Sequence, residues 1–489
     1  MTPIDVTRSE VGLAPDPRRR IAKPYLPGDH GQRDGRSRAE ELLERILALS
    51  PEEMENTLQG VRDGFSGRHA DLDGILQEGF SAVAHLLPDP AGVSDEMRRV
   101  IGAYFMHEYS IEGAALTNPS IVPALDQSDA HPGTIRVIVS LRAVGEGHIS
   151  SIEFRTGLIG PGGRIELETP GDPTIGSRRP PVFDRALFTN KLDEMGAATE
   201  LVDRALGGLS DRFTMGDLEV ALEDLGRQEG FSHAVQQVTQ EMHWLASSNY
   251  ELNFPESSKL SERVLFPSGP SESRGMEDAR FVRFTESDGS VVYYATYTAY
   301  DGMSILPQLI ETIDFQTFRI ATLNGRAARN KGIALFPRRI DDRYAALSRS
   351  DGESNHFMVS DHVRFWHESQ RIQRPRRPWE LVQIGNAGSP IETEAGWLVV
   401  THGVGPMRRY VLGAILLDID DPSRVIGQLE DPLLEPDETE RDGYVPNVVY
   451  SCGSIVHDGN LVIAYGASDT STSFASMSLD SVLGGLTQR

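Results

Sequence analysis

The segment Val291-Val292-Tyr293-Tyr294-Ala295-Thr296-Tyr297 decides the fold class. Its β-branched and aromatic residues are typical of a β-strand, and the dipeptide Asp288-Gly289 just before it predicts a hairpin turn. Short apolar runs of this kind, such as Trp397–Thr401 and Leu461–Tyr465, alternate with turn residues from Asn249 to Ser478. Regular short strands predict a mainly β fold, and periodicity alone leaves a sandwich, a barrel or a propeller open.

Two other parts of the chain have helical spacing. From residue 37 onward, apolar residues recur at the intervals of a helix face, and Ser50-Pro51-Glu52-Glu53 has the composition of a helix N-terminus. Asp73–Leu87 and Ser94–Tyr109 predict further helices. A second helical block, at about residues 180–246, interrupts strand-rich sequence on both sides, so we interpret it as an insertion.

These patterns divide the chain into three parts. Residues 1–36, rich in Pro, Asp, Arg and Gly, are expected to form a flexible N-terminal segment. Residues 37–115 are expected to form a helical region, and residues 116–489 a β domain that carries the insertion. Within that domain, Gly157 to Leu167, with Pro161-Gly162-Gly163 at its centre, predicts a hairpin.

The charge balance excludes some partners. Lys and Arg number 47 and Asp and Glu number 72, so the formal net charge is −25. An acidic surface disfavours nucleic acid, and the basic clusters are short, as at Arg18–Arg20 and Arg374–Arg377. No run approaches the ~18 consecutive apolar residues of a membrane span, so we expect no membrane partner.

The cysteine content bears on the compartment. The chain has a single cysteine, Cys452, so it can form neither an intramolecular disulfide nor a multi-cysteine metal site. That usage suits a reducing compartment. The N-terminal residues also lack the apolar run that a signal peptide needs. We therefore expect a cytoplasmic protein without a metal site.

The strongest candidate for chemistry is the segment Ser271–Phe281, which contains the adjacent carboxylates Glu277 and Asp278. Strand alternation predicts that these two side chains point to opposite sides, one into a cavity and one toward a supporting ion pair. A charge cluster at a strand end is more often structural, with Arg274 or Arg280 as its partner. Spacing alone therefore favours an ion pair over a catalytic site.

A resemblance changes that balance. Gly275-Met276-Glu277-Asp278-Ala279-Arg280 resembles the Gly-x-Glu-Asp-Pro-Arg signature of glycoside hydrolase family 130, the β-mannoside phosphorylases and mannosidases, with Ala279 in place of the usual proline. Other blocks resemble the family in sequence order. They include Asn330–Pro337, Tyr344–Arg349, Gly385–Pro390, Thr393–Val404, Tyr410–Ala414, Val445–Val448 and Tyr465–Asp469. The agreement spans roughly residues 249–470.

The resemblance implies a fold and a mechanism. The fold would be a five-bladed β-propeller, here with an α-helical N-terminal region and a helical insertion, and the site would lie at the mouth of the central channel. The reaction would invert the anomeric carbon. Asp278 matches the family's acid, whose proton is thought to pass through a sugar hydroxyl, and Glu277 would support the site.

The resemblance also implies roles for seven further residues. Lys331 and Arg349 match basic positions that contact phosphate. The remaining five match positions that bind substrate, and they are Asn118, Arg280, His402, Tyr410 and Asp469. Taken alone, a histidine at a strand end is more often structural, and an aspartate in Ser-Asp-Thr is more often part of a turn.

The attacking group remains open between phosphate and water. A phosphorylase must hold a phosphate dianion with two or three convergent cations, which favours Lys331 and Arg349. A further basic residue is expected on the strand that enters Gly385, but the chain has Gln383 there, with Glu392 nearby. Glu392 could instead be the general base of a hydrolase.

We therefore expect an enzyme that cleaves terminal β-mannosides with inversion, with phosphate slightly favoured over water. No cofactor is implied, and inorganic phosphate would be a co-substrate. The partner is an oligosaccharide or mannoside substrate, and the helical regions are candidate contacts for a homo-oligomer. The rival hypotheses are a non-catalytic sugar-binding propeller and a scaffold assembled through its helices.

Overall fold

The computed structural model describes residues 4–28, 37–69, 71–230 and 232–488. The chain forms two compact units. One unit comprises Arg18–Ser110, and the other combines Met1–Pro17 with Ile111–Arg489. Within the described ranges, no helix has both the length and the apolar character needed to cross a membrane.

The unit Arg18–Ser110 is mainly helical. Its elements are β2 (Arg20–Pro24), α1 (Arg38–Leu47), α2 (Pro51–Phe65), α3 (Leu72–Val83), α4 (Asp95–Tyr104) and β3 (Met106–Ser110). The predicted start of α2 is confirmed, because Ser50 and Glu53 form a reciprocal capping box in front of Pro51. The helices bury one apolar cluster that includes Phe80, Val100 and Phe105.

One predicted helix in this unit is too long. The sequence suggested Ser94–Tyr109, but α4 ends at Tyr104 and residues 106–110 form β3, which pairs with β2. Short segments adopt the strand conformation when a partner strand supplies their backbone hydrogen bonds, and local periodicity does not reveal that partner.

The second unit consists mainly of β-sheet. Most consecutive strands pair in antiparallel fashion and fall into five groups along the chain. The first two groups belong to one 12-stranded sheet, joined by the parallel pair Ser150 and Gly275. The first group is β4 (Ala115–Pro123), β5 (Ile135–Val144), β6 (Ser150–Ile159) and β7 (Ile165–Leu167). The second is β14 (Gly275–Thr285), β15 (Val291–Tyr300), β16 (Ile305–Thr312) and β17 (Thr317–Thr322).

The other three groups follow in chain order. The third is β18 (Ala334–Leu335), β19 (Tyr344–Ser348), β20 (Asn355–Ser360) and β21 (Gln370–Gln373). The fourth is β22 (Gln383–Asn386), β23 (Ile391–Thr393), β24 (Gly396–Val404), β25 (Tyr410–Leu417) and β26 (Val425–Gln428). The fifth is β27 (Val449–His457), β28 (Asn460–Ala467) and β29 (Ser471–Ser478).

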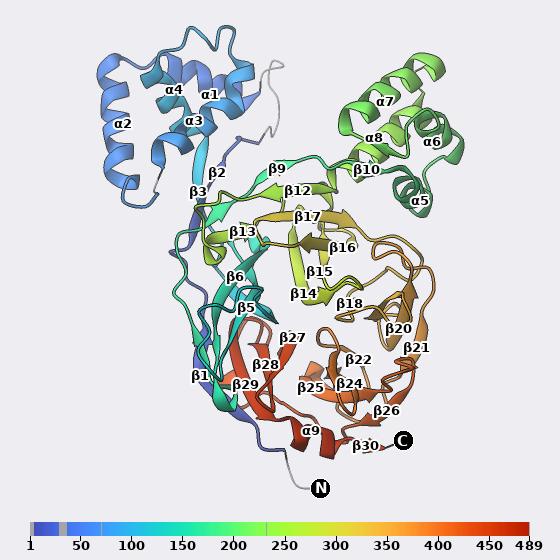
Figure 1. Ribbon diagram of the computed structural model, residues 1–489. Helices are drawn as coiled ribbons and strands as arrows, with labels where there is room; N and C mark the ends of the chain where they lie inside the picture. Colours follow the sequence, from blue (N-terminus) through green and yellow to red (C-terminus); the bar gives the residue numbers. More distant parts are fainter. Residues whose placement is uncertain (1–3, 29–36, 70, 231, 489) are drawn as a thin grey trace. The chain divides into compact units, whose positions relative to one another are not determined.

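Short strands and one helix extend these groups. They are β8 (Thr174–Ile175), β9 (Ser177–Arg179), β12 (Tyr250–Asn253), β13 (Arg263–Leu265), α9 (Leu479–Gly485) and β30 (Thr487–Gln488). Two predicted hairpins are confirmed, since Gly157 pairs with Leu167 and the turn at Asp288-Gly289 joins β14 to β15. A similar turn at Asp458-Gly459 joins β27 to β28. In Figure 1, β14, β18, β22 and β27 lie nearest the middle of this unit.

The N-terminal residues differ from the sequence-based expectation. Residues 1–36 were expected to be flexible, but Thr7–Leu13 form β1, which pairs with β29 and completes the fifth group. The segment Thr-Arg-Ser-Glu-Val-Gly-Leu has only a weak apolar pattern, so its strand conformation depends on the edge of β29, a partner more than 450 residues away.

The helical insertion forms a compact subdomain within this second unit. Its elements are β10 (Phe183–Asp184), α5 (Arg185–Met195), α6 (Thr199–Leu206), β11 (Arg212–Phe213), α7 (Met215–Glu229) and α8 (His233–Ser247). The helices bury their own apolar cluster. Two polar contacts anchor α5 to the segment after β17, since Lys191 donates to the Leu323 carbonyl and Glu194 accepts from the Gly325 amide.

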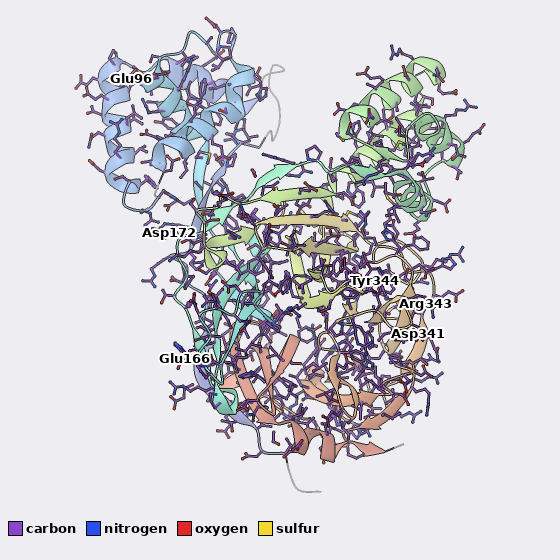
Figure 2. The ribbon with its side chains drawn as sticks, viewed as in Figure 1. Glu96, Glu166, Asp172, Asp341, Arg343 and Tyr344 are labelled. Atoms are coloured by element: carbon purple, nitrogen blue, oxygen red, sulfur yellow. The ribbon has the colours of Figure 1, made fainter. Side chains whose placement is uncertain are left out.

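In Figure 2, the labelled side chains of Glu166, Asp341 and Arg343 lie toward the outside of the β unit. Asp341, Arg343 and Tyr344 belong to the turn before β19 and to its first residue, and Glu166 lies on β7 at an outer edge. The Tyr344 hydroxyl donates to Glu286, and the Arg339 guanidinium stacks on its ring. The polar side chains with candidate roles in catalysis instead gather on the inner strands.

Candidate active site

Three inner strands carry the same irregularity. In β14, Glu277 pairs with Thr298 and Arg280 with Thr296, so three steps along one strand match two along the other. The same extra residue occurs in β4 between Thr117 and Ser120, and in β27 between Tyr450 and Gly453. These are β-bulges, which bend a strand and redirect its side chains.

The bulge in β14 corrects the prediction that Glu277 and Asp278 point to opposite sides. Asp278 has a φ of +56°, which ends the regular alternation of the strand at this residue. Lys331 forms an ion pair with Glu277, and its positive charge also lowers the pKa of Asp278, so one cation acts on both carboxylates. A left-handed φ is uncommon for a non-glycine residue and is least costly for Asn and Asp, so an aspartate can occupy this position in the bulge.

Gly275 permits the close packing at the start of β14. Its φ is +139°, and a Cβ at this position would lie 2.3 Å from the Ser150 hydroxyl and 2.8 Å from the Ser150 amide. Any side chain would therefore push β14 away from β6. Gly275, the first residue of the signature segment, thus allows β14 to pack closely against β6 of the first strand group.

Each carboxylate of the pair has its own partners. Asn118 on β4 donates from Nδ2 to Asp278 Oδ1, which fixes the orientation of that carboxyl group. Glu277 accepts from Arg142 Nη2 at 2.7 Å through Oε1 and from Lys331 Nζ at 2.6 Å through Oε2. Asn118 therefore orients the carboxyl of Asp278, and Glu277 holds two cations beside it.

The electrostatic surroundings keep Asp278 ionised. Asp278 is only 8% exposed, and burial acts to raise the pKa of its carboxyl group. The positive charges of Lys331, Arg142 and Arg280 outweigh that effect, and the Asn118 hydrogen bond adds to them, so the pKa lies below its ordinary value. To become an acid, Asp278 needs an added negative charge nearby.

Arg280 and Arg349 bring further positive charge. Arg280 Nη2 donates to the Tyr450 hydroxyl at 2.6 Å, and Arg280 Nη1 donates to the Asp278 carbonyl at 3.2 Å. Arg349 Nη1 lies 2.8 Å from His402 Nε2. Because a guanidinium can only donate, Nε2 must accept, and a neutral imidazole is required.

The second nitrogen of His402 is consistent with this assignment. Nδ1 lies 3.1 Å from the Asn386 carbonyl, to which it donates. Burial depresses the pKa of His402 well below its usual range, and the nearby guanidinium groups of Arg349 and Arg280 depress it further. His402 is thus a neutral side chain that accepts a hydrogen bond from Arg349 and positions it. It does not itself transfer a proton at neutral pH.

Tyr410 and Asp469 lie in the same region. The Tyr410 ring stacks on His402 with centroids 6.3 Å apart, and both rings lie near Tyr450. Burial raises the pKa of Asp469 to about 6, and the negative charges of Asp278 and Glu277 contribute to that rise. The positive charges of Arg142 and Lys331 act to lower the pKa of Asp469. Asp469 therefore interacts with the same charged residues as Asp278 and Glu277.

Glu392 is not part of this group. Its side chain is 44% exposed and forms a two-point ion pair with Arg338, whose guanidinium stacks on Trp397. Glu392 pairs with Trp397 on β24, five residues before His402, which is about 16 Å at ~3.3 Å per residue. The expectation that Glu392 could activate water at the Asp278 site is therefore wrong.

Several site residues were missed by the sequence analysis. They are Arg142 on β5, Asn386 on β22 and Tyr450 on β27. Arg142 had a local signal, since it is a charged residue at the end of an apolar strand. Tyr450 and Asn386 had none, because only the approach of separate strand groups gives them a role. Among the residues that the structure describes, no group of His, Cys, Asp and Glu could hold a metal ion.

Comparison with known proteins identifies the family. A model described as beta-1,4-mannooligosaccharide phosphorylase, that of glycoside hydrolase family 130, matches residues 236–488, which is more than half of the chain. The chain belongs to glycoside hydrolase family 130. The resemblance predicted from the sequence is thereby confirmed, and the family match includes Glu277, Asp278, Lys331, Arg349, His402, Tyr410 and Asp469.

Proteins named as β-mannoside phosphorylases are among the relatives. A 1,2-beta-oligomannan phosphorylase of Thermoanaerobacter sp. (strain X514) is 34% identical over 220 residues, which cover 43% of the chain and 71% of the relative. A beta-1,2-mannobiose phosphorylase of Listeria innocua is 31% identical over 227 residues, covering 45% and 62%. A solved structure of beta-1,2-mannobiose phosphorylase from Listeria innocua has a TM-score of 0.45 at 21% identity, covering 77% and 93%.

Two site residues lie outside the matched family segment. Asn118 and Arg142 belong to the first strand group, which precedes residue 236. Their contacts with Asp278 and Glu277 show that the first strand group completes the site formed by the family segment.

Proposed function

We propose that this protein cleaves terminal β-mannosides by phosphorolysis, with inversion, and releases α-mannose 1-phosphate. The observation that carries the proposal is the convergence of Arg142, Arg280 and Lys331 around one buried aspartate, with Arg349 bound to His402 in the same group. A phosphate dianion needs several convergent cations, because charge-assisted hydrogen bonds supply most of its binding energy.

The carboxylates support phosphate over water. An inverting hydrolase needs a second carboxylate, about 6.5–9.5 Å from the acid, to activate water. Glu277 is bound on both oxygens by cations, and Glu392 pairs with Arg338 far along β24. Glu392, the base that the sequence suggested for a hydrolase, and Glu277 are therefore both held in ion pairs, whereas the cations match the needs of phosphate.

Phosphate binding would also prepare the acid. Asp278 is ionised because neighbouring cations lower its pKa. A phosphate dianion among those cations would offset their charge and raise the pKa of Asp278, which favours the protonated form. Asn118 holds Oδ1, so Oδ2 would carry the proton toward the leaving oxygen, directly or through a substrate hydroxyl.

The proposal includes the arrangement of the β unit. The five strand groups would be the blades of a β-propeller, with β1 completing the last blade and the charged group at the mouth of the central channel. Hydrogen bonds between inner strands of different groups support this arrangement, as between Asn118 and Asp278, Arg280 and Tyr450, and Asn386 and Gly332. The cytoplasmic location and the homo-oligomer stay predictions.

Product analysis tests the function. The chain would be incubated with β-1,2- and β-1,4-mannobiose, with and without inorganic phosphate, beside the Asp278→Asn variant and the Glu392→Gln control. We expect mannose 1-phosphate only with phosphate, unchanged in the control and lost in Asp278→Asn. Free mannose formed equally in both buffers would make the enzyme a hydrolase. Mannoside binding without any product would favour a sugar-binding propeller.

A further inference from the structure

A cavity lies between the helical insertion and the second strand group. Its volume is about 140 Å³, and it is lined from the insertion by Asp184, Leu187 and Arg212, and from the β-sheet side by Arg319, Asn324 and Arg364. That volume is well below the roughly 300 Å³ at which pockets for drug-sized ligands begin, so an oligosaccharide would not fit. The cavity suits a small ligand.

The charges of this cavity are unusual. Arg319 is held by Glu251 and Glu311, each at 3.1 Å. The guanidinium groups of Arg212 and Arg364, in contrast, make no hydrogen bond or ion pair with any residue in the described ranges. Arg364 is partly buried, and a buried cation without a partner carries a desolvation cost that a bound anion would offset.

Two further observations favour an anion in this cavity. Burial lowers the pKa of Arg364, and the positive charges of Arg319 and Arg212 lower it further, against the opposing effect of Glu311 and Asp184. The Asn324 Oδ1 atom is also buried without a hydrogen-bond partner in the described part of the chain. A ligand that carries both an anionic group and a hydroxyl donor would satisfy the arginines and this oxygen.

We propose that this cavity, named here the seam site, binds a phosphate or phosphomonoester anion between Arg212 of the insertion and Arg364 of the β unit. Phosphate is preferred over a carboxylate because it has three or more oxygens, so some can accept from the two guanidinium groups while a protonated one donates to Asn324 Oδ1. The seam site is separate from the Asp278 site, and it does not depend on the proposed function.

The position of the seam site suggests what it does. Asn324 lies in the segment that α5 anchors through Lys191 and Glu194, and this segment leads directly to Lys331. Asn324 also exchanges backbone hydrogen bonds with the segment of Arg364, at 2.8 Å to the Arg364 carbonyl and 2.8 Å from the Trp366 amide. An anion at the seam site would therefore link the insertion to the segment that leads to Lys331.

Equilibrium dialysis with labelled inorganic phosphate tests this proposal on the full chain. We expect two phosphate sites in the wild type and in the control Arg338→Gln, whose arginine pairs with Glu392 away from the cavity. Arg364→Gln should weaken one site by about tenfold or more, as expected for loss of a charge-assisted contact. Arg212→Gln should weaken the same site, and because Arg212 is exposed its variant should fold.

The Lys331→Met variant separates the two phosphate proposals. If it loses one site and keeps the one that needs Arg364, both proposals stand. If it keeps two sites, the phosphate role of Lys331 fails while the seam site stands. A single wild-type site that is lost in Lys331→Met and unaffected by Arg364→Gln and Arg212→Gln would overturn the seam site.

Competition identifies the source of the anion. Mannose 1-phosphate would be added to labelled phosphate on the Lys331→Met variant, at a phosphate concentration too low to fill the weakened Asp278 site, so that the label reports the seam site. Displacement well below the concentration of unlabelled phosphate that has the same effect would assign the site to a phosphomonoester. Displacement only by inorganic phosphate would assign it to the free ion, and no retained label in this variant would contradict the proposal.

Discussion

Lys331 provides the sharpest test of the phosphate hypothesis. Its ammonium group donates to Glu277 at 2.6 Å and also lowers the pKa of the neighbouring Asp278. A purely structural role would be to hold Glu277, whereas the proposed role is to bind phosphate. The Lys331→Met variant keeps most of the volume of the side chain and removes its charge.

The expected size of the effect follows from the contact that would be lost. A hydrogen bond to a charged group is worth about 1.5–3 kcal/mol, which corresponds to roughly 10- to 100-fold in affinity. The Lys331 side chain is 34% exposed, so solvent screening places the effect toward the lower end. We expect the KM for phosphate to rise about tenfold, with a smaller change in the KM for the mannoside.

The assay is initial rates against phosphate concentration at fixed ionic strength and saturating mannoside. Lys259→Met serves as the control, because Lys259 is exposed and lies outside the charged group. Glu277→Gln is the matched variant for the structural alternative. If Lys331→Met and Glu277→Gln lower kcat alike and leave the phosphate dependence unchanged, Lys331 serves only to hold Glu277 and the reasoning is refuted.

Three other perturbations follow from the site. Asn118→Ala removes the hydrogen bond that holds Asp278, so kcat should fall about tenfold with little change in melting temperature, and normal kcat would contradict an orienting role. Asp469→Asn should raise the free energy of unfolding at pH 7.5 by roughly 1–2 kcal/mol and much less at pH 4.5, measured by urea unfolding. The sign follows because the folded pKa of about 6 lies above the unfolded value, so the charged carboxylate costs stability as pH rises through 6. Gly275→Ala should lower both stability and activity, because its Cβ would lie 2.3 Å from the Ser150 hydroxyl, and an unchanged melting temperature would be evidence against this close contact.

Much of the site could be predicted from the sequence, but its geometry could not. The signature around Glu277 and Asp278, together with Lys331, Arg349 and His402, was recognisable because these residues lie in contiguous blocks. The alternation rule then failed, since a bulge in β14 gives Asp278 a positive φ. A bulge depends on the partner strand as well as on the bulged segment, so one strand's sequence does not reveal it.

Pairing between distant segments accounts for the other differences. Thr7–Leu13 form a strand only because β29 offers an edge, and Met106–Ser110 form one only because β2 does. Glu392 looked like a candidate base because of its nearness in sequence to Gly385. The register of β24 instead places it beside Trp397 and Arg338, at the other end of the strand from His402.

By itself, the sequence determined the mainly β class, the two helical regions, the family and the identity of the acidic pair. Those properties depend on short contiguous segments, because residue type, turn dipeptides and helix caps can all be recognised locally. Only the tertiary structure decided that Arg142 and Lys331 share Glu277, that Asn118 orients Asp278, and that Glu392 lies elsewhere. The reason is physical: the charge state of a buried carboxyl depends on the cations around it, and here those cations come from segments that are up to about 190 residues apart in the chain.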